Sequence, residues 1–268
     1  MSLGSAASIF LDIGNCGTGM KIFMCFIILG MMGHAHGQAN STSADGAAWT
    51  EGATLTFYGD ANGGGTLAGA CGYGNLLATP YKLMIAAGNP PMFEEGLGCG
   101  RCWEIRCVGN PGCTATVTIT MTDLCPCGSD GVHFDMSQPA FHALASGPAE
   151  AEQLVTAGKL QGQYRRVPCD LGLGKAFTAI VRAATNPSFL SILMRDIPGA
   201  GDIKTAECAP GGGSTFSPMT QDFGAMYNFN GKWTSPVSLR LTLGDGQILT
   251  GISCIPAAWK PTTTYTCK

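Results

Sequence analysis

Alternating apolar and polar positions are the clearest pattern in the chain, and they predict strands. From residue 114 to 122, threonine occupies every even position and an apolar residue every odd one. A period of two predicts a strand with one buried face and a threonine face near solvent. Residues 237–243 repeat the pattern, and Gly244-Asp245-Gly246 supplies a turn. Residues 247–255 can return as the hairpin partner.

Helical signals are sparse. The best candidate starts with Ser137 as N-cap and runs to Leu144, with Pro139 tolerated in the first turn. A short strand is predicted over residues 177–181, and Gly-rich turns separate the other strand-like segments. The pattern therefore predicts an all-β fold.

Charge and cysteine content change between Cys169 and Pro187. Residues 40–174 hold six basic and twelve acidic side chains, whereas residues 175–268 hold eight and five. Cysteines fall from eight to three across the same point. We expect two domains, over residues 54–174 and 187–268, joined by a linker over 175–186.

Composition excludes several classes of protein. Hydrophobic residues make up 45% of the 268 positions, which supports a core and argues against disorder. The 39 glycines follow no three-residue period, so the chain is not collagen-like. A net charge of −3 gives no electrostatic case for nucleic acid as a partner.

The N-terminal segment predicts secretion. Lys21 is followed by 11 mostly apolar residues and then by small residues up to Gly37, the layout of a cleaved signal. The run is too short for a spanning helix, which needs about 20 apolar residues. We expect a signal over 1–37, with translation starting at Met20, and a leader over 38–53. Asn40 begins the one permitted glycosylation sequon.

Thirteen cysteines are too many for a reduced cytosolic domain. Signal cleavage leaves eleven, which predicts disulfides with one cysteine left over. Cys99-Gly100-Arg101-Cys102 and Cys125-Pro126-Cys127 also permit a zinc or redox interpretation, but one CxxC with one CxC is a weak metal signature. We expect no metal and no cofactor.

Two carboxylates stand out as candidate chemistry. Asp135 lies between apolar neighbours and near His133, and a carboxyl beside apolar surface can act as a general acid. Asp123 ends the threonine strand, where it can line a groove. The alternative is that both only cap strands or face solvent.

An ordered set of motifs then narrows the class. The chain carries, in this order, Thr56-Phe57-Tyr58-Gly59, Gly69-Ala70-Cys71-Gly72-Tyr73-Gly74, Gly98-Cys99-Gly100-Arg101-Cys102-Trp103, His133-Phe134-Asp135-Met136-Ser137 and Tyr164-Arg165-Arg166-Val167-Pro168-Cys169. Together they resemble the expansins, the cell-wall-loosening proteins of plants. Asp123 and Gly88-Asn89-Pro90-Pro91-Met92-Phe93 resemble the β-expansin branch.

The resemblance implies a six-stranded double-psi β-barrel, like the family-45 glycoside hydrolases, followed by an immunoglobulin-like β-sandwich that binds polysaccharide. It implies three disulfides, Cys71–Cys99, Cys102–Cys169 and Cys107–Cys113. The pairing of Cys125, Cys127, Cys208, Cys254 and Cys267 stays open. It also implies a groove lined by Thr56, Tyr58, Asp123, His133 and Asp135.

Two mechanisms follow from that groove. Asp135 matches the general acid of the related hydrolases, whereas expansins are thought to lack the base and to separate glycans without cutting them. We favour the second mechanism. Asp60 lies two residues after Tyr58, where the hydrolases hold their base, so a family-45-like endoglucanase is the alternative. Asp60 is also a common residue for starting a turn.

In the sandwich, the resemblance implies a flat row of rings that packs on sugar faces: Phe189, Phe223 and Tyr227, extended by Phe57. The alternative is that some of these rings belong to the core. A secreted adhesion or allergen-like protein using only the sandwich is a third class. We expect a monomer in the plant cell wall whose partners are cellulose, xylan or other matrix glycans.

Overall fold

The computed structural model describes residues 47–63 and 69–268. The predicted signal, the start at Met20 and the glycosylation site at Asn40 lie outside the described residues. Among the described residues, no helix is both long and apolar enough to cross a membrane.

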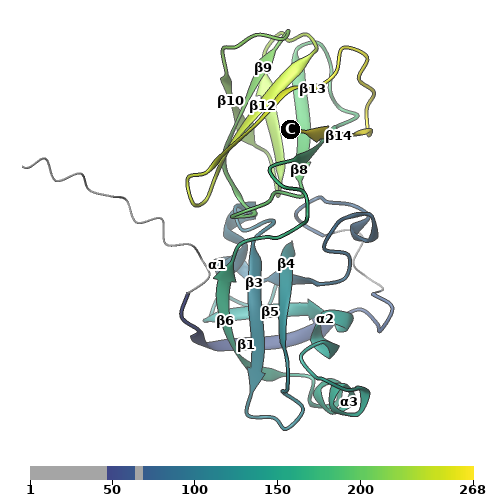
Figure 1. Ribbon diagram of the computed structural model, residues 1–268, viewed down its shortest axis with the longest axis vertical. Coiled ribbons are helices and arrows are strands. Elements are labelled where there is room, and N and C mark those ends of the chain that lie inside the picture. The colour runs from purple at the N-terminus through teal and green to yellow at the C-terminus, as the bar shows by residue number, and fades with distance from the viewer. Residues whose placement is uncertain (1–46, 64–68) are drawn as a thin grey trace, which may run out of the picture. The chain divides into compact units, whose positions relative to one another are not determined.

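The first domain is a closed six-stranded barrel with strand order β1-β5-β2-β4-β3-β6 (Figure 1). Its strands are β1 (Thr50–Tyr58), β2 (Ile85–Gly88), β3 (Cys102–Val108), β4 (Thr116–Leu124), β5 (Val132–Ser137) and β6 (Leu160–Val167). The β1–β5 and β2–β4 pairs are parallel and the other four are antiparallel. This is the double-psi barrel that the family resemblance implied.

Strand β4 confirms the predicted strand with its threonine alternation, shifted by two residues. The expected threonine face near solvent is correct only at its start, where Thr116 and Thr118 are exposed. Thr120 and Thr122 are buried. The reason is that the chain around Cys71 covers this end of the strand, with the Cys71 amide donating to the Thr122 carbonyl at 3.3 Å.

Short helices fill the connections. The predicted helix is α2 (Gln138–His142), and the Ser137 hydroxyl accepts from the Ala140 amide as an N-cap. The others are α1 (Pro90–Phe93), α3 (Pro148–Ala157) and the 3-10 turns η2 (Leu76–Ala78) and η3 (Glu94–Gly96). Helix α3 was not predicted because it buries only Ala151 and Leu154, too few positions for a clear apolar stripe.

The second domain holds eight strands in the order β13-β12-β9-β10-β11-β8-β7-β14 (Figure 1). They are β7 (Phe177–Val181), β8 (Phe189–Arg195), β9 (Ile203–Pro210), β10 (Ser217–Gln221), β11 (Met226–Asn230), β12 (Val237–Leu243), β13 (Ile248–Ile255) and β14 (Thr264–Cys267). The predicted 177–181 strand and the predicted hairpin are β7 and β12–β13. Strand β10 pairs first with β9 and then with β11, which links the two layers of the sandwich.

Two predicted boundaries are wrong. The leader does not extend to residue 53, because β1 begins at Thr50 and the Trp49 ring lies 4.3 and 4.8 Å from the Arg106 and Arg165 guanidinium carbons. Residues 175–186 are not a free linker either. They contain β7, which pairs with both β8 and β14 inside the sandwich.

The three implied disulfides, Cys71–Cys99, Cys102–Cys169 and Cys107–Cys113, are all present. Two further bonds join Cys125 to Cys127 and Cys254 to Cys267. Cys208 is the free cysteine among the described residues, and it is buried in the sandwich core. The expected leftover cysteine is therefore Cys208.

A buried carboxylate joins the barrel to the sandwich. Asp202 accepts from Arg101 Nε at 2.9 Å and from Arg166 Nη2 at 3.0 Å, and both arginines belong to the barrel. Nearby, a Cβ added at Gly100 or at Gly201 would overlap the carbonyl of the other glycine. Both glycines have positive φ, so this close approach of two backbones depends on glycine at both positions.

We expect Asp202→Asn to lower the stability of the protein by about 1–3 kcal/mol. Breaking a fully buried ion pair costs about 3–5 kcal/mol, and here both arginines are partly hydrated, which reduces the loss. Thermal unfolding measures the change. Glu207→Gln is the matched control, because its partner Arg240 is at the surface and exposed pairs contribute little. Equal melting temperatures for both variants would contradict a stabilising role for Asp202.

Candidate functional site

The candidate site lies on the outward-facing side of β1 and β5. The parallel register pairs Thr54 with His133 and Thr56 with Asp135. Leu55 and Phe134, the intervening residues, are fully buried in the barrel core. Successive side chains of a strand point to opposite faces. Because Leu55 and Phe134 point inward, the side chains of Thr54, Thr56, His133 and Asp135 lie together on the outward face.

Three of the predicted groove residues form a hydrogen-bonded chain. The Thr56 hydroxyl donates to Asp135 Oδ1 at 2.6 Å, and His133 Nε2 lies 2.8 Å from the same hydroxyl. A hydroxyl has one proton to donate, so His133 must donate to Thr56. This assigns the histidine proton to Nε2 and orients the Asp135 carboxylate.

The environment fixes the protonation of the neighbouring groups. Burial lowers the pKa of His133, and the Asp135 carboxylate partly opposes this change, so the imidazole is neutral at pH 7. Burial raises the pKa of Tyr58, and the charges of Asp123 and Asp135 raise it further. Tyr58 therefore keeps its proton and can donate to a sugar hydroxyl.

Asp123 is part of the same site, but its carboxylate accepts hydrogen bonds from backbone amides. Its Oδ1 accepts from the Ala70 amide at 2.6 Å and from the Leu124 amide at 2.7 Å. The negative charge of Asp123 contributes to the raised pKa of Tyr58. Asp123 thus fixes the loop at Ala70 and, together with Asp135, helps to keep Tyr58 protonated.

Asp60 starts a turn, as one of its two interpretations proposed. Its Oδ1 accepts from the Asn62 amide at 2.8 Å, and its carbonyl accepts from the Gly63 amide at 2.9 Å. The side chain is exposed. These two contacts are typical of an aspartate that starts a turn.

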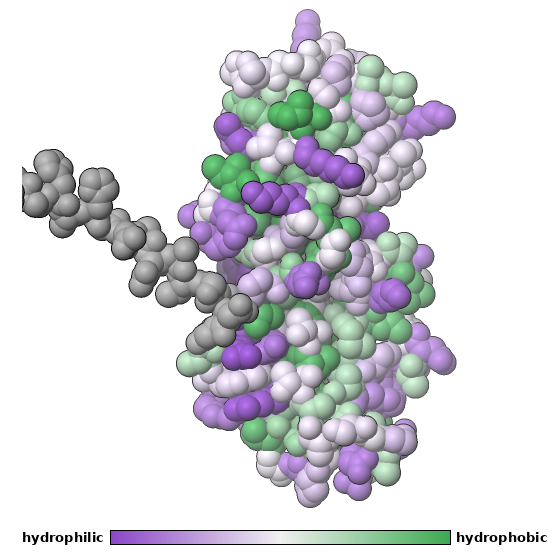
Figure 2. All heavy atoms as spheres, in the orientation of Figure 1, coloured by the Kyte–Doolittle hydropathy of each residue, from purple (hydrophilic) through white to green (hydrophobic). Residues whose placement is uncertain are grey.

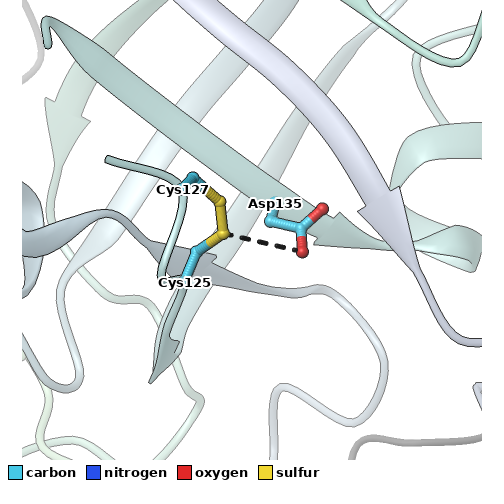
Figure 3. A group of neighbouring side chains, drawn as sticks. All are labelled: Cys125, Cys127 and Asp135. Carbon is cyan, nitrogen blue, oxygen red and sulfur yellow. Dashed lines mark hydrogen bonds between the residues drawn. A yellow bond between two sulfur atoms is a disulfide. The ribbon is translucent and has the colours of Figure 1, made fainter. Parts of the chain in front are cut away.

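Sequence patterns did not predict that Cys125 and Cys127 lie beside Asp135. Figure 3 shows both sulfurs close to the carboxylate, with Cys125 Sγ 3.9 Å from Asp135 Oδ2. Because this sulfur is in a disulfide, it is a neighbour of the oxygen rather than a donor to it. The available signal was a CxC motif shortly before the carboxylate strand.

The four rings expected to form a row differ in exposure, and two of them pack inside the protein. Tyr227 is 4% exposed and its hydroxyl donates to the Ile203 carbonyl at 3.0 Å, so it belongs to the sandwich core. Phe57 follows the inward register of Leu55 and packs on Phe141 with ring centroids 5.0 Å apart. Phe189 is half-buried at the start of β8. Phe223 is 50% exposed.

Phe223 remains the best candidate for stacking on a sugar. A Cβ added at Gly72 would lie 3.8 Å from its ring, so this ring lies next to the barrel. On the face shown in Figure 2, apolar residues form small patches separated by polar ones. Single exposed rings fit that surface better than a continuous apolar platform.

Two open hollows meet at Leu97. One, of about 550 Å³, is lined by Pro90, Phe93, Glu94, Glu95, Leu97 and Leu124. The other, of about 410 Å³, is lined by Leu97 and by residues of β9, β10 and β11 in the sandwich. Leu124 is the last residue of β4 and follows Asp123 directly.

This combination defines a two-domain class of protein, in which a double-psi barrel bearing an outward-facing polar site is followed along the chain by a β-sandwich. Residues 85–164 match a family model described as lytic transglycolase, and residues 178–256 match one described as the expansin C-terminal domain. Expansin-B11 of Oryza sativa subsp. japonica is 40% identical over 223 residues, covering 80% of this chain and 75% of the relative. Expansin-B4 of Arabidopsis thaliana is 38% identical over 221 residues, covering 80% and 84%.

The chain belongs to the expansin family, and these relatives are of the β-expansin branch. Its fold matches the crystal structure of an expansin from Clavibacter michiganensis with a TM-score of 0.62 at 20% identity, covering 81% of this chain and 95% of that one. A mutant of the Clavibacter protein in complex with cellohexaose gives a TM-score of 0.61 with the same coverage. These structures agree with the predicted barrel and sandwich.

We expect Asp135→Asn to lower the pKa of His133 further. The carboxylate is the group that raises this pKa, while burial lowers it and is unchanged by the substitution. An NMR titration of the His133 ring measures the change. A His133 pKa that stays the same or rises in the variant would contradict the electrostatic coupling of the two groups.

We expect Tyr227→Ala to destabilise the sandwich by roughly 3–5 kcal/mol, as for other large aromatic residues removed from a core. Phe223→Ala is the matched control and should leave the melting temperature almost unchanged, since its ring is half exposed. Thermal unfolding of both variants tests the assignment. The reverse order of stabilities would show that the two rings have been assigned to the wrong places.

Proposed function

We propose that the barrel site centred on Asp135 binds a wall polysaccharide and competes for the hydrogen bonds between neighbouring glycan chains. Membership of the expansin family makes this a cell-wall-loosening protein, and the endoglucanase alternative is not favoured. The observation that carries the proposal is the oriented carboxylate of Asp135, held by the Thr56 hydroxyl at 2.6 Å.

The chemistry of the site supports binding rather than cleavage. An inverting glycosidase needs a second carboxylate as base, about 6.5–9.5 Å from the acid. The two other candidate carboxylates, Asp60 and Asp123, both accept hydrogen bonds from backbone amides. A carboxylate, a hydroxyl and a protonated tyrosine instead offer acceptors and donors to sugar hydroxyls.

The ligand is proposed to be an extended β-linked glycan of the cellulose or matrix class. The solved Clavibacter expansin with cellohexaose supports this choice, since its fold is shared. A long chain would run from the polar site past Leu124 and Leu97, which line the two hollows, toward the sandwich. Phe223 would stack on a pyranose face, and the protein is proposed to act as a secreted monomer.

Asp135→Asn should reduce the extension of heat-inactivated walls under load by about tenfold. A hydrogen bond to a charged group contributes about 1.5–3 kcal/mol, and 1.4 kcal/mol is a factor of ten. Asp60→Asn is the matched control, because asparagine can keep the turn at that exposed position. Wild-type extension by a folded Asp135→Asn protein would overturn the proposal.

Phe223→Ala should weaken binding to insoluble wall polysaccharide by up to about tenfold, because stacking on an exposed ring contributes roughly 0.5–1.5 kcal/mol. A depletion assay with washed walls measures the bound fraction. Phe216→Ala serves as the control, since the Phe216 ring is occupied by the Arg240 guanidinium at 4.3 Å. Equal binding by the two variants would remove Phe223 from the site.

A further inference from the structure

The loop between β4 and β5 places two sulfurs beside the central carboxylate of the site. The sulfurs of Cys125 and Cys127 and a carboxylate oxygen of Asp135 all lie within 4.8 Å of one another (Figure 3). Neither the proposed function nor the family resemblance assigns any task to this pair of cysteines.

Hydrogen bonds hold the loop independently of its disulfide. The Cys125 amide donates to the Gly88 carbonyl at 2.8 Å. The fully buried Asn89 side chain donates to the carbonyls of Gly128 and Gly131, both at 3.2 Å, and accepts from the His133 amide at 3.3 Å. Opening the sulfur–sulfur bond would therefore leave both thiols close to Asp135.

This disulfide also closes the shortest loop of the five and has one partly exposed cysteine. Its cysteines are two positions apart, whereas the other four bonds span 6, 13, 28 and 67 positions. In the chain-entropy model a short closed loop contributes least to the stability of the fold, so opening this bond costs the fold less than opening any of the other four. Cys127 is partly exposed between Pro126 and Gly128, both exposed, which gives a reductant access.

We propose that Cys125, Cys127 and Asp135 form a redox-gated site for a soft divalent cation of the Zn²⁺ class. A dithiol reductant supplies two electrons and two protons to the Cys125–Cys127 bond and leaves as its own disulfide. The cation then binds the two sulfurs and displaces their two protons. Asp135 Oδ2 is the third ligand, and water completes a tetrahedral shell.

The set of donor atoms selects the metal. Thiolate sulfur favours Zn²⁺ over Mg²⁺ or Ca²⁺, and three protein ligands with an open position suit zinc. Thr56 already holds Asp135 Oδ1, and His133 holds Thr56, so Oδ2 is the oxygen that faces Cys125. Such an outer layer of hydrogen bonds orients a ligating carboxylate and strengthens metal binding.

Cation binding would occupy the carboxylate that the glycan site uses. In the oxidised protein Asp135 is available to the glycan, and in the reduced, metal-loaded protein it is not. The metal site itself does not depend on the proposed wall-loosening function, because it can be measured without any polysaccharide.

The first measurement tests whether the Cys125–Cys127 disulfide is reduced before the buried Cys102–Cys169 disulfide. The full secreted chain is treated with a limiting dose of a phosphine reductant, and new thiols are trapped by alkylation and mapped on peptides. We expect Cys125 and Cys127 to be labelled at least tenfold faster than the buried Cys102 and Cys169. Simultaneous opening of both bonds, with loss of the folded state, would overturn the proposal.

The second measurement titrates the reduced protein with Co²⁺, which reports thiolate ligation through a charge-transfer absorption band, and then displaces it with Zn²⁺. We expect one equivalent to bind. Asp135→Asn should bind at least tenfold more weakly, whereas the exposed-turn control Asp60→Asn should bind as the wild type does. The Cys125→Ser, Cys127→Ser double variant, checked for an intact fold, should give no band.

An absent band in the reduced wild-type protein, or equal affinity in Asp135→Asn, would refute the site. Wall extension by reduced protein, with and without added Zn²⁺, forms a separate arm. We expect Zn²⁺ to reduce extension at least fivefold and a chelator to restore it. Failure of extension in the oxidised protein would count against the proposed function alone, because the cobalt band would be unaffected.

Discussion

The parallel pairing of β1 with β5 is the constraint on which the site depends. It sets Thr56 beside Asp135 and Leu55 beside Phe134. Phe134 packs edge-on against Trp103 and Tyr164, at centroid distances of 5.8 and 5.6 Å. A slip of one residue would turn this ring to the surface and Asp135 into the core. The aromatic contacts of the barrel interior therefore fix the polar site on its outside.

The carboxylates of the barrel show how local contacts separate structural from functional roles. Asp60 and Asp123 accept from backbone amides, so their oxygens define a turn and a loop. Asp135 instead accepts from the side chain of Thr56, and its second oxygen faces the Cys125–Cys127 pair. That arrangement agrees with the proposal that Asp135 is the carboxylate that binds glycan.

Much of the fold was predictable because its signals are local. The alternation in β4 and in β12, the turn after β12 and the N-cap at Ser137 each depend on adjacent residues. The boundary errors arose from contacts distant in sequence. Trp49 is held by Arg106 and Arg165, and β7 is held by β8 and β14, and no local pattern reports either.

The candidate site could also be predicted only where its signals are local in sequence. The family motifs predicted Thr56, His133 and Asp135. The parallel register of β1 and β5 brings these three residues together. They did not predict the burial of Tyr227, because the direction of that ring depends on β11 pairing with β8 and packing over the sandwich core. The neighbourhood of Cys125, Cys127 and Asp135 depends on a loop anchored by Asn89, which only the folded structure reveals.

The central claim is that the protein separates glycan chains without cutting them. The most direct measurement follows the creep of heat-inactivated walls under constant load while new reducing ends and the chain-length distribution of wall glycans are determined on the same samples. The account predicts sustained creep with no new reducing ends and an unchanged chain-length distribution. Reducing ends that increase in proportion to creep would contradict it and identify the protein as a hydrolase.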